Sequence, residues 1–596
     1  MTPSLHSAQT NTAGYKNLQM VSLLYITIPT ILFIAGWLRL YFSIPLIILV
    51  FIGIYLSLYT APVHGFSEKI TKEKINRGTI TKYAFIIAFL IFTVICAGVG
   101  GFTAQDSDHN KHNAFFKDLI EYPWPIGYQH TGPDYAPRVL NTYIGYYLPS
   151  ALVGKIFGWA VGYFFSFLWV CIGLFLTILW LQRISKGRLL YLTFVLLFFS
   201  GLDIIGWEFF LDKNPFGEHY NYSTWMLHYS WGPVKDKLNG TFWLLGSNHT
   251  AIGLAPHHIF PSWICILMIF YDATRLQSNQ RILFIAAFLP LTSAFVSIGM
   301  FPFVLLALYQ NGLKGGINLV NLVIAPLLVV VGGLFLLSNN TQFVHGWIWD
   351  FVEIHKALPS LLLFYVLGFG LYFIALPKST RFFDIKELQW VYLSAICILI
   401  FPIYRMGLFM DFPNKGFLPS WIIIQVCIAI FVSRYQMLFN LNPLDKIRFG
   451  LMLLLLILGS VAALSNIFFA LKGGIFWGNV KELNIPHIDE DKSEQSLQLF
   501  SDGRTFFWKH LAKEVIYQPS DNFMKDRFGN TFVFENEQCN PSQGYYILVN
   551  GSRRGCASQL NKNEYGLIVA TTGYGDKWLF NGRDWVCNMP QPCRTE

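Results

Sequence analysis

The sequence predicts an all-α membrane protein that crosses the bilayer about 13 times and carries a small α+β domain at its C-terminal end. Composition is the first observation: of 596 residues, 54% are hydrophobic and only 13% are charged, whereas soluble domains average about 25% charged residues. The second observation is a series of long apolar runs. The third is a change to polar, strand-like sequence beyond residue 474.

The apolar runs define the membrane region, which we place at residues 1–473. Most of them approach the roughly 20 residues that a spanning helix needs. The run at 282–311 contains Pro290 and Pro302, so we expect it to break into two short helices of a hairpin. The segment 138–157 carries several tyrosines, a proline and a lysine, and we expect it to lie at the interface without spanning. The runs lie near residues 20–38, 41–61, 80–102, 158–182, 189–206, 252–272, 282–311, 317–337, 359–376, 388–404, 418–434 and 447–471.

Basic residues predict the orientation of these spans. Lysine and arginine favour the cytoplasmic side of a membrane, and their densest group lies between the second and third spans. The N-terminus should therefore be cytoplasmic and the C-terminus extracytoplasmic. The outward loops then cover about 103–157, 207–251, 338–358 and 405–417. The net charge of +9 comes mostly from the inner loops and predicts no nucleic-acid partner. The inner basic residues are Lys69, Lys72, Lys74, Arg77, Lys82, Arg183, Lys186, Arg188, Arg275, Arg281, Lys378, Arg381, Arg434, Lys446 and Arg448.

The region 474–596 is expected to be a small extracytoplasmic α+β domain. The segments 531–534, 545–549 and 565–570 are rich in strand-forming residues and are separated by glycine turns, which predicts strands. Cysteines in an outward region predict two disulfides, with the pairing left open. Zinc binding is the alternative, although no Cys-x-x-Cys pair is present. The cysteines are Cys539, Cys556, Cys587 and Cys593.

The first outward loop opens with a dense run of ionisable residues directly after an apolar segment. Charge so close to a membrane is costly unless it has a use. On a helix that begins near Asp108, this residue shares a face with Lys111 and His112. A carboxylate beside these groups can act as a general base or, together with Asp106, hold a divalent cation. The alternative is a solvated loop tip.

A second acidic site is predicted at the outer end of another span, where Asp203 follows an uncharged run. A carboxylate beside isoleucine and tryptophan is costly unless it functions. The alternative is a helix-terminal aspartate that accepts hydrogen bonds from the backbone. His249, His257 and His258 open the next span and could face the same cavity, although a lone histidine is more often structural.

A third site combines Arg405, Asp411 and Lys415 near an outer membrane surface. Arginine offers a bidentate fork and lysine a point charge, which suits the phosphate or pyrophosphate of a lipid. The alternative is that both side chains snorkel to the interface.

In these three sites and in its spans, the chain resembles the GT-C superfamily of polyprenyl-phosphate-dependent glycosyltransferases. This superfamily includes lipid A aminoarabinose transferases, protein O-mannosyltransferases and oligosaccharyltransferases. It is similar in particular to uncharacterised bacterial members, and the resemblance covers most of the membrane region. The chain departs from the usual pattern of this superfamily in two ways. The acidic loop follows the third span, whereas in many members it follows the first. Lys415 stands where we expect an arginine. No Trp-Trp-Asp acceptor motif is present, which weakens an oligosaccharyltransferase assignment. The motifs are Asp108-His109-Asn110-Lys111-His112-Asn113, Tyr122-Pro123-Trp124-Pro125, Tyr146-Tyr147-Leu148-Pro149, Ser200-Gly201-Leu202-Asp203 and Asp411-Phe412-Pro413-Asn414-Lys415.

The resemblance implies glycosyl transfer on the outer face of a bacterial inner membrane. The partners would be a sugar carried on a polyprenyl phosphate, a glycan, lipid or protein acceptor, and membrane lipids. Asp108 would be the general base, and Asp106 or Asp203 would orient the acceptor or join Asp108 in holding an optional Mg or Mn ion. No cofactor is required, because a lipid phosphate is already a fair leaving group. The residues expected to bind substrate or phosphate are Lys111, His112, Asn113, His258, Arg405, Asp411 and Lys415.

Three other functions stay open at this point. A membrane O-acyltransferase would use His257 or His258, but these histidines are predicted to face outward rather than toward a cytoplasmic donor. An O-antigen polymerase or ligase would need more outward arginines in the membrane region. A transporter or scaffold would place charge at the middle of the membrane in broken helices rather than at outer helix ends.

Overall fold

The computed structural model divides the chain into two compact units. One consists of Met1–Ile120, Tyr143–Leu337 and Gln342–Ile485, and the other of Glu121–Thr142, Ser338–Thr341 and Pro486–Glu596. The second unit thus combines part of the segment 103–157 with most of the C-terminal region. The structure describes residues 5–59, 77–103, 105, 107–131, 136–202, 230–231, 243–244, 247–339, 344–407, 410–434, 442–473, 485–488, 499–518, 523–525, 528, 530–540, 544–550, 552–557, 559–562, 567–571, 577–581 and 583–587.

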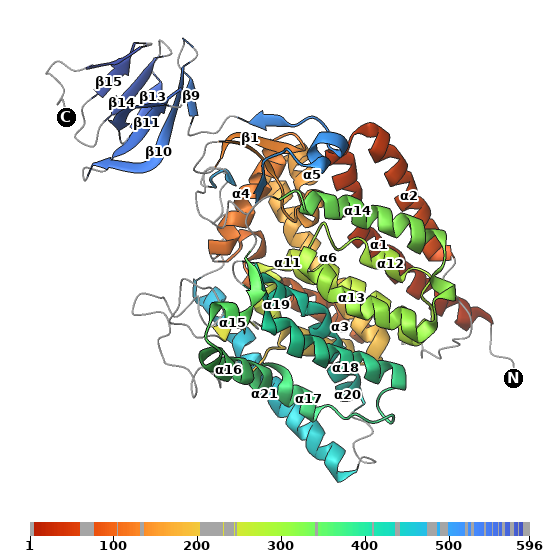
Figure 1. Ribbon diagram of the computed structural model, residues 1–596. Helices are drawn as coiled ribbons and strands as arrows, with labels where there is room; N and C mark the ends of the chain where they lie inside the picture. Colours follow the sequence, from red (N-terminus) through yellow and green to blue (C-terminus); the bar gives the residue numbers. More distant parts are fainter. Residues whose placement is uncertain are drawn as a thin grey trace. The chain divides into compact units, whose positions relative to one another are not determined.

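The first unit is built mostly of helices (Figure 1). Across the described residues, nine helices are long and apolar enough to cross a membrane, and two shorter apolar helices lie at Ile80–Cys96 and Val320–Leu336. These helices indicate a multi-pass membrane protein, while the count of about 13 spans stays a prediction. The nine are Tyr15–Trp37, Leu40–Tyr59, Trp159–Ser185, Pro256–Leu276, Ala294–Asn311, Ala357–Ala375, Ile385–Ile403, Asp411–Ser433 and Pro443–Lys472.

The bounds of the secondary structure in this unit follow the apolar runs closely. The α-helices are α1 (Leu5–Trp37), α2 (Leu40–Tyr59), α3 (Arg77–Cys96), α4 (Ser107–Glu121), α5 (Leu148–Phe157), α6 (Trp159–Ser185), α7 (Leu189–Leu197), α10 (Asn248–Leu254), α11 (Pro256–Tyr271), α12 (Ile282–Ala286), α13 (Ala294–Asn311), α14 (Ala325–Leu336), α15 (Ile348–Phe351), α16 (Ile354–Leu363), α17 (Leu371–Ala375), α18 (Ile385–Ile400), α19 (Asp411–Gly416), α20 (Leu418–Ser433) and α21 (Pro443–Gly473). Short turns of other helix types are η1 (Val99–Gly101), η2 (Gly145–Tyr147), η3 (Asp272–Leu276), η4 (Lys314–Gly316), η5 (Val320–Ile324), η6 (Phe364–Gly370) and η7 (Phe401–Ile403). Within the described residues, two small antiparallel sheets pair β3 (Ser230–Trp231) with β4 (Trp243–Leu244), and β5 (His345–Trp347) with β6 (Tyr404–Met406).

Helix α11 lies inside this unit, where it packs against α1, α6, α13 and α20 (Figure 1). Its sequence is apolar on every side, and a helix of that kind is enclosed by its neighbours. Every residue from Pro256 to Tyr271 is buried. Proline suits the first turn because it needs no hydrogen-bond acceptor there. A fully buried helix therefore carries His257 and His258 in its first turn.

Two apolar segments that were expected not to form single spans are both interrupted, although the run 282–311 does not form two short helices, since Pro302 lies inside α13. The run 282–311 breaks before α13, leaving α12 with five residues, so α13 alone has the length of a span. The segment 138–157 does not form one long helix, because α5 has ten residues and follows a strand. Cysteines of the membrane region are free thiols, namely Cys96, Cys171, Cys265, Cys397 and Cys427.

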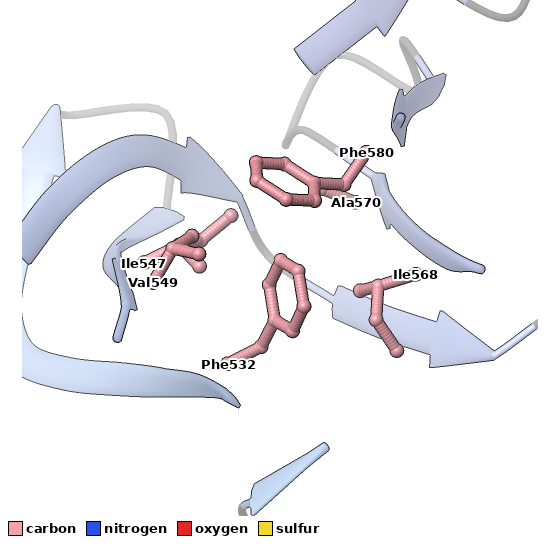
Figure 2. Packing of buried hydrophobic residues seen from close by; sticks show 6 residues of the cluster. All are labelled: Phe532, Ile547, Val549, Ile568, Ala570 and Phe580. Carbon is pink, nitrogen blue, oxygen red and sulfur yellow. The ribbon is translucent and has the colours of Figure 1, made fainter. Parts of the chain in front are cut away.

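The second unit contains three four-stranded sheets. Two of them, ordered β12-β11-β10-β9 and β13-β14-β15-β16, share a core of apolar side chains that alternate along the strands (Figure 2). Strands therefore occur in all three segments where the sequence predicts them. The core residues are Phe532, Ile547, Val549, Ile568, Ala570 and Phe580. The strands of these two sheets are β9 (Phe523–Lys525), β10 (Thr531–Asn540), β11 (Gly544–Val549), β12 (Ser552–Ala557), β13 (Gln559–Lys562), β14 (Ile568–Thr571), β15 (Lys577–Phe580) and β16 (Trp585–Cys587).

The third sheet joins distant parts of the sequence. Its order is β7-β2-β1-β8, with β1 (Ile126–Thr131) and β2 (Ala136–Leu140) following α4 in the sequence. The other two strands, β7 (Phe500–Ser501) and β8 (Ile516–Gln518), flank the short helical turn η11 (Phe507–Leu511). Strand β1 pairs in parallel with β8 and antiparallel with β2. The boundary at residue 474 stays a prediction, because the second unit also recruits residues 121–142.

A buried ion pair stabilises the end of α11. The Nε and Nη2 atoms of Arg281 donate to the two carboxylate oxygens of Asp272 at 2.6 and 2.8 Å, and both residues are almost fully buried. We expect Asp272→Ala to destabilise the protein by about 3–5 kcal/mol, because it leaves an uncompensated buried guanidinium. Thermal unfolding of the purified protein in detergent measures this loss.

A matched control is available at the surface. Glu353 lies 3.3 Å from His355, and both side chains are exposed. Exposed pairs contribute little, so Glu353→Ala should leave the unfolding temperature unchanged. Equal unfolding temperatures for the Asp272→Ala and Glu353→Ala proteins would contradict the assigned role of the buried pair.

Candidate functional site

A cluster of imidazole and phenol groups lies at the first turn of α11. The hydroxyl of Tyr147, in η2, lies 3.0 Å from Nδ1 of His112 on α4 and 3.0 Å from Nδ1 of His257. The two imidazole ring centres are 4.9 Å apart. Tyr147 therefore bridges two histidines that are separated by more than a hundred residues in the sequence. We call His112, Tyr147, His257 and His258, together with Tyr143, the histidine cluster.

His258 extends this cluster inward. Its ring centre lies 3.9 Å from that of His257, and the ring of Tyr143 stacks on His257 at 4.8 Å. Among the described residues, neither ring nitrogen of His258 has a hydrogen-bond partner, nor does Nε2 of His257. Both histidines are almost fully buried. Burying an unsatisfied donor costs about 1–3 kcal/mol, so these nitrogens are groups that a polar ligand can satisfy.

Two lysines, one on α4 and one on α19, lie near the histidine cluster. Lys111 and Lys415 both lie close enough to interact electrostatically with His257 and His258. The Nζ atom of Lys415 donates to a carboxylate oxygen of Asp411 at 2.5 Å, one helical turn away. Four of the predicted substrate-binding residues, Lys111, His112, His258 and Lys415, are thus brought together.

Arg405 belongs to the same charged group through Asp411. It lies on β6, is almost fully buried, and its guanidinium carbon is 4.6 Å from the ring centre of Phe351. Burial lowers the pKa of Arg405, and the nearby Asp411 carboxylate raises it. Asp411 thus interacts with one cation on β6 and one on α19. The structure places all three residues of the third predicted site together.

Helix α19 reaches this position because two glycines meet. A Cβ atom added to Gly299 on α13 would lie 1.8 Å from the carbonyl oxygen of Gly416. The last turn of α19 therefore packs directly against the backbone of α13, which only glycine allows. Gly416 follows Lys415, so this contact fixes the position of the cation.

Two predicted polar groups have structural roles. The side-chain amide of Asn113 donates to Gln105, whose own amide donates to the carbonyl of Gly98 and the hydroxyl of Tyr163. Nε2 of His249 donates to the carbonyl of Thr93 at 3.1 Å. Burial lowers the pKa of His249 to about 4, so this imidazole is neutral at pH 7. Both side chains hold neighbouring turns in place.

The remaining predicted site residues are not among those that the structure describes. Asp106, Asp203 and Cys593 lie outside the described residues, as do the side chains of Asp108, Cys539, Cys556 and Cys587. Within the described residues, no group of three or more histidine, cysteine or acidic side chains could hold a metal ion. The predicted carboxylate pair, the tentative metal site and the disulfides therefore stay predictions.

The sequence did not single out Tyr143 or Tyr147 as site residues. The available signal was the cluster of tyrosines just before Pro149. No family model, curated protein or solved structure matches the chain. The function is therefore argued from the site itself.

Proposed function

We propose that this protein is a membrane glycosyltransferase that moves a sugar from a polyprenyl-phosphate donor to an acceptor hydroxyl. The observation that carries the proposal is the placement of Lys111 and Lys415 near two buried imidazoles, with Arg405 near Asp411, in a multi-pass membrane protein. A lipid-linked phosphate is an anion that reaches such a site from the bilayer. Cations in a water-poor site stabilise its charge strongly.

The proposed role of each residue follows from the charge of its side chain. Lys415 and Arg405 bind the phosphate that leaves the anomeric carbon, while Asp411 holds both cations in place. Asp108 takes the proton of the acceptor hydroxyl as that oxygen attacks. Asp106 or Asp203 orients the acceptor. The reaction takes place on the outer face of a bacterial inner membrane, with the C-terminal region on the same side.

Mass spectrometry of envelope glycans and glycoproteins tests this proposal. Cells would carry the wild type, a deletion or Lys415→Met at matched protein levels. We expect one sugar unit to disappear in the deletion and to fall at least about tenfold in Lys415→Met, since a hydrogen bond to a charged group contributes about 1.5–3 kcal/mol. The missing mass identifies the sugar.

A control variant and the results that would contradict the proposal can both be stated. Lys314 is an exposed lysine in η4, and Lys314→Met should leave the glycans unchanged. A deletion that alters no glycan would show that the transferase proposal is wrong. Equal glycan levels in Lys415→Met and Lys314→Met would remove Lys415 from the donor site.

A membrane O-acyltransferase is the second candidate. The specific observation that favours it is the buried His258, whose ring nitrogens have no hydrogen-bond partner in the described part of the chain. A neutral imidazole of this kind suits a general base in acyl transfer. The same mass spectra separate the two functions, because the deletion would then remove acyl groups and leave every sugar in place.

A further inference from the structure

Tyr147 forces the two histidines that it bridges into complementary states. Its hydroxyl carries one proton and lies 3.0 Å from Nδ1 of both His112 and His257. It can donate to only one of these nitrogens, so the other must donate to the phenol oxygen. When all three groups are neutral, one Nδ1 is protonated and the other is not.

The two ends of this bridge face different parts of the site. His112 lies four residues after Asp108 on α4, the spacing that places two side chains on one helix face. His257 lies at the first turn of α11, within electrostatic range of Lys415. Its Nε2 atom is buried with no hydrogen-bond partner in the described chain. One end therefore follows the proposed base by four residues on α4, and the other lies within electrostatic range of the proposed phosphate-binding cation.

We propose that His112, Tyr147 and His257 form a proton relay that delivers the acceptor proton to the departing phosphate, with His257 as the general acid. This inference rests on the proposed transferase function. In the starting state Nδ1–H of His112 donates to Tyr147, the Tyr147 hydroxyl donates to Nδ1 of His257, and Nε2–H of His257 faces the phosphate.

The proton transfers along the relay account for every proton and bond in the reaction. The acceptor oxygen forms a bond to the anomeric carbon, and the carbon–oxygen bond to phosphate breaks with its electron pair on the phosphate. Nε2 of His257 gives its proton to a phosphate oxygen, the Tyr147 proton moves to His257, and the Nδ1 proton of His112 moves to Tyr147. Asp108 passes the acceptor proton to Nε2 of His112. The products are the glycoside and a lipid hydrogen phosphate.

Nitrogen NMR of the full-length protein labelled with [15N]histidine tests the relay without substrate. His112→Gln and His257→Gln assign the signals. We expect one protonated and one unprotonated Nδ1 in the wild type, and we expect inorganic phosphate to shift the Nε2 signal of His257. Tyr147→Phe should abolish the complementary pattern. Tyr309→Phe is the control, since this tyrosine is exposed on α13 and the substitution removes the same hydroxyl group.

Three results would overturn the relay. If the Nδ1 atoms of His112 and His257 have the same protonation state, Tyr147 does not bridge them by hydrogen bonds. If inorganic phosphate does not shift the Nε2 signal of His257, this residue is not the general acid. In cells, Tyr147→Phe should reduce the sugar unit by roughly 10²-fold, with Tyr309→Phe unchanged; equal levels in the two variants would also overturn it. Failure of the transferase proposal is recognised separately, because the deletion would then leave every glycan unchanged.

Discussion

Asp108→Asn should fold like the wild type and transfer sugar about 10²–10⁴-fold more slowly, the usual contribution of a general base. The residue lies in the first turn of α4, and the helix is anchored further along by Phe115 and Leu119, which are fully buried. A carboxylate near a helix N-terminus contributes only about 0.3–1 kcal/mol through the helix dipole. The rate should therefore fall while the unfolding temperature changes little.

The measurement is the initial rate of sugar transfer in membranes that contain matched amounts of protein, beside thermal unfolding in detergent. Asn110 provides the control, because it is exposed on the same helix. Asn110→Ala should retain the wild-type rate. An Asp108→Asn protein as fast as this control would remove Asp108 from the mechanism, whereas a large loss of thermal stability would assign it a structural role.

Gly299→Ala should destabilise the protein by about 1–3 kcal/mol, the usual cost of forcing extra volume into a packed site. The new methyl group would meet the carbonyl oxygen of Gly416 at 1.8 Å, and neither backbone can move without shifting a helix. Because Gly416 follows Lys415, the shift would also displace the cation. A displacement of about 1 Å can cost 10²-fold in rate, so activity should fall further than stability alone explains.

Gly333→Ala gives the opposite expectation. This glycine lies on α14, where an added Cβ would meet no atom within 4 Å. Alanine is a better helix former than glycine by about 1 kcal/mol, so this variant should unfold at the same or a higher temperature. Both variants add the same single methyl group, and thermal unfolding compares them directly. If both proteins unfold at the same temperature, the contact between α13 and α19 is not close-packed.

Local sequence patterns predicted the features that depend on local chemistry. The apolar runs predicted spanning helices, Pro290 lies where the run 282–311 breaks, and glycine steps separate the strands near residues 531–571. The pairing of Lys415 with Asp411 was not predicted, because both residues were expected in an outward loop and the structure places them one turn apart on α19.

Features that depend on packing between distant segments were not predictable in this way. The bridge from Tyr147 to His257 requires η2 to lie beside α11, and no local pattern encodes that contact. For the same reason, the hydrogen bond from the Asn113 amide to Gln105 was not predicted. The close approach of Gly299 and Gly416 likewise joins positions more than a hundred residues apart.

The enclosure of α11 also determines how the site responds to its lipid surroundings. A helix that faces lipid tilts or shifts when the bilayer becomes thicker or thinner. Helix α11 has no exposed residue from Pro256 to Tyr271, whereas α2 and α21 keep many exposed apolar side chains. Hydrophobic mismatch would therefore be absorbed by α2 and α21. The histidine pair should keep its geometry in membranes of different thickness, so that acyl-chain length alters donor entry more than the chemical step.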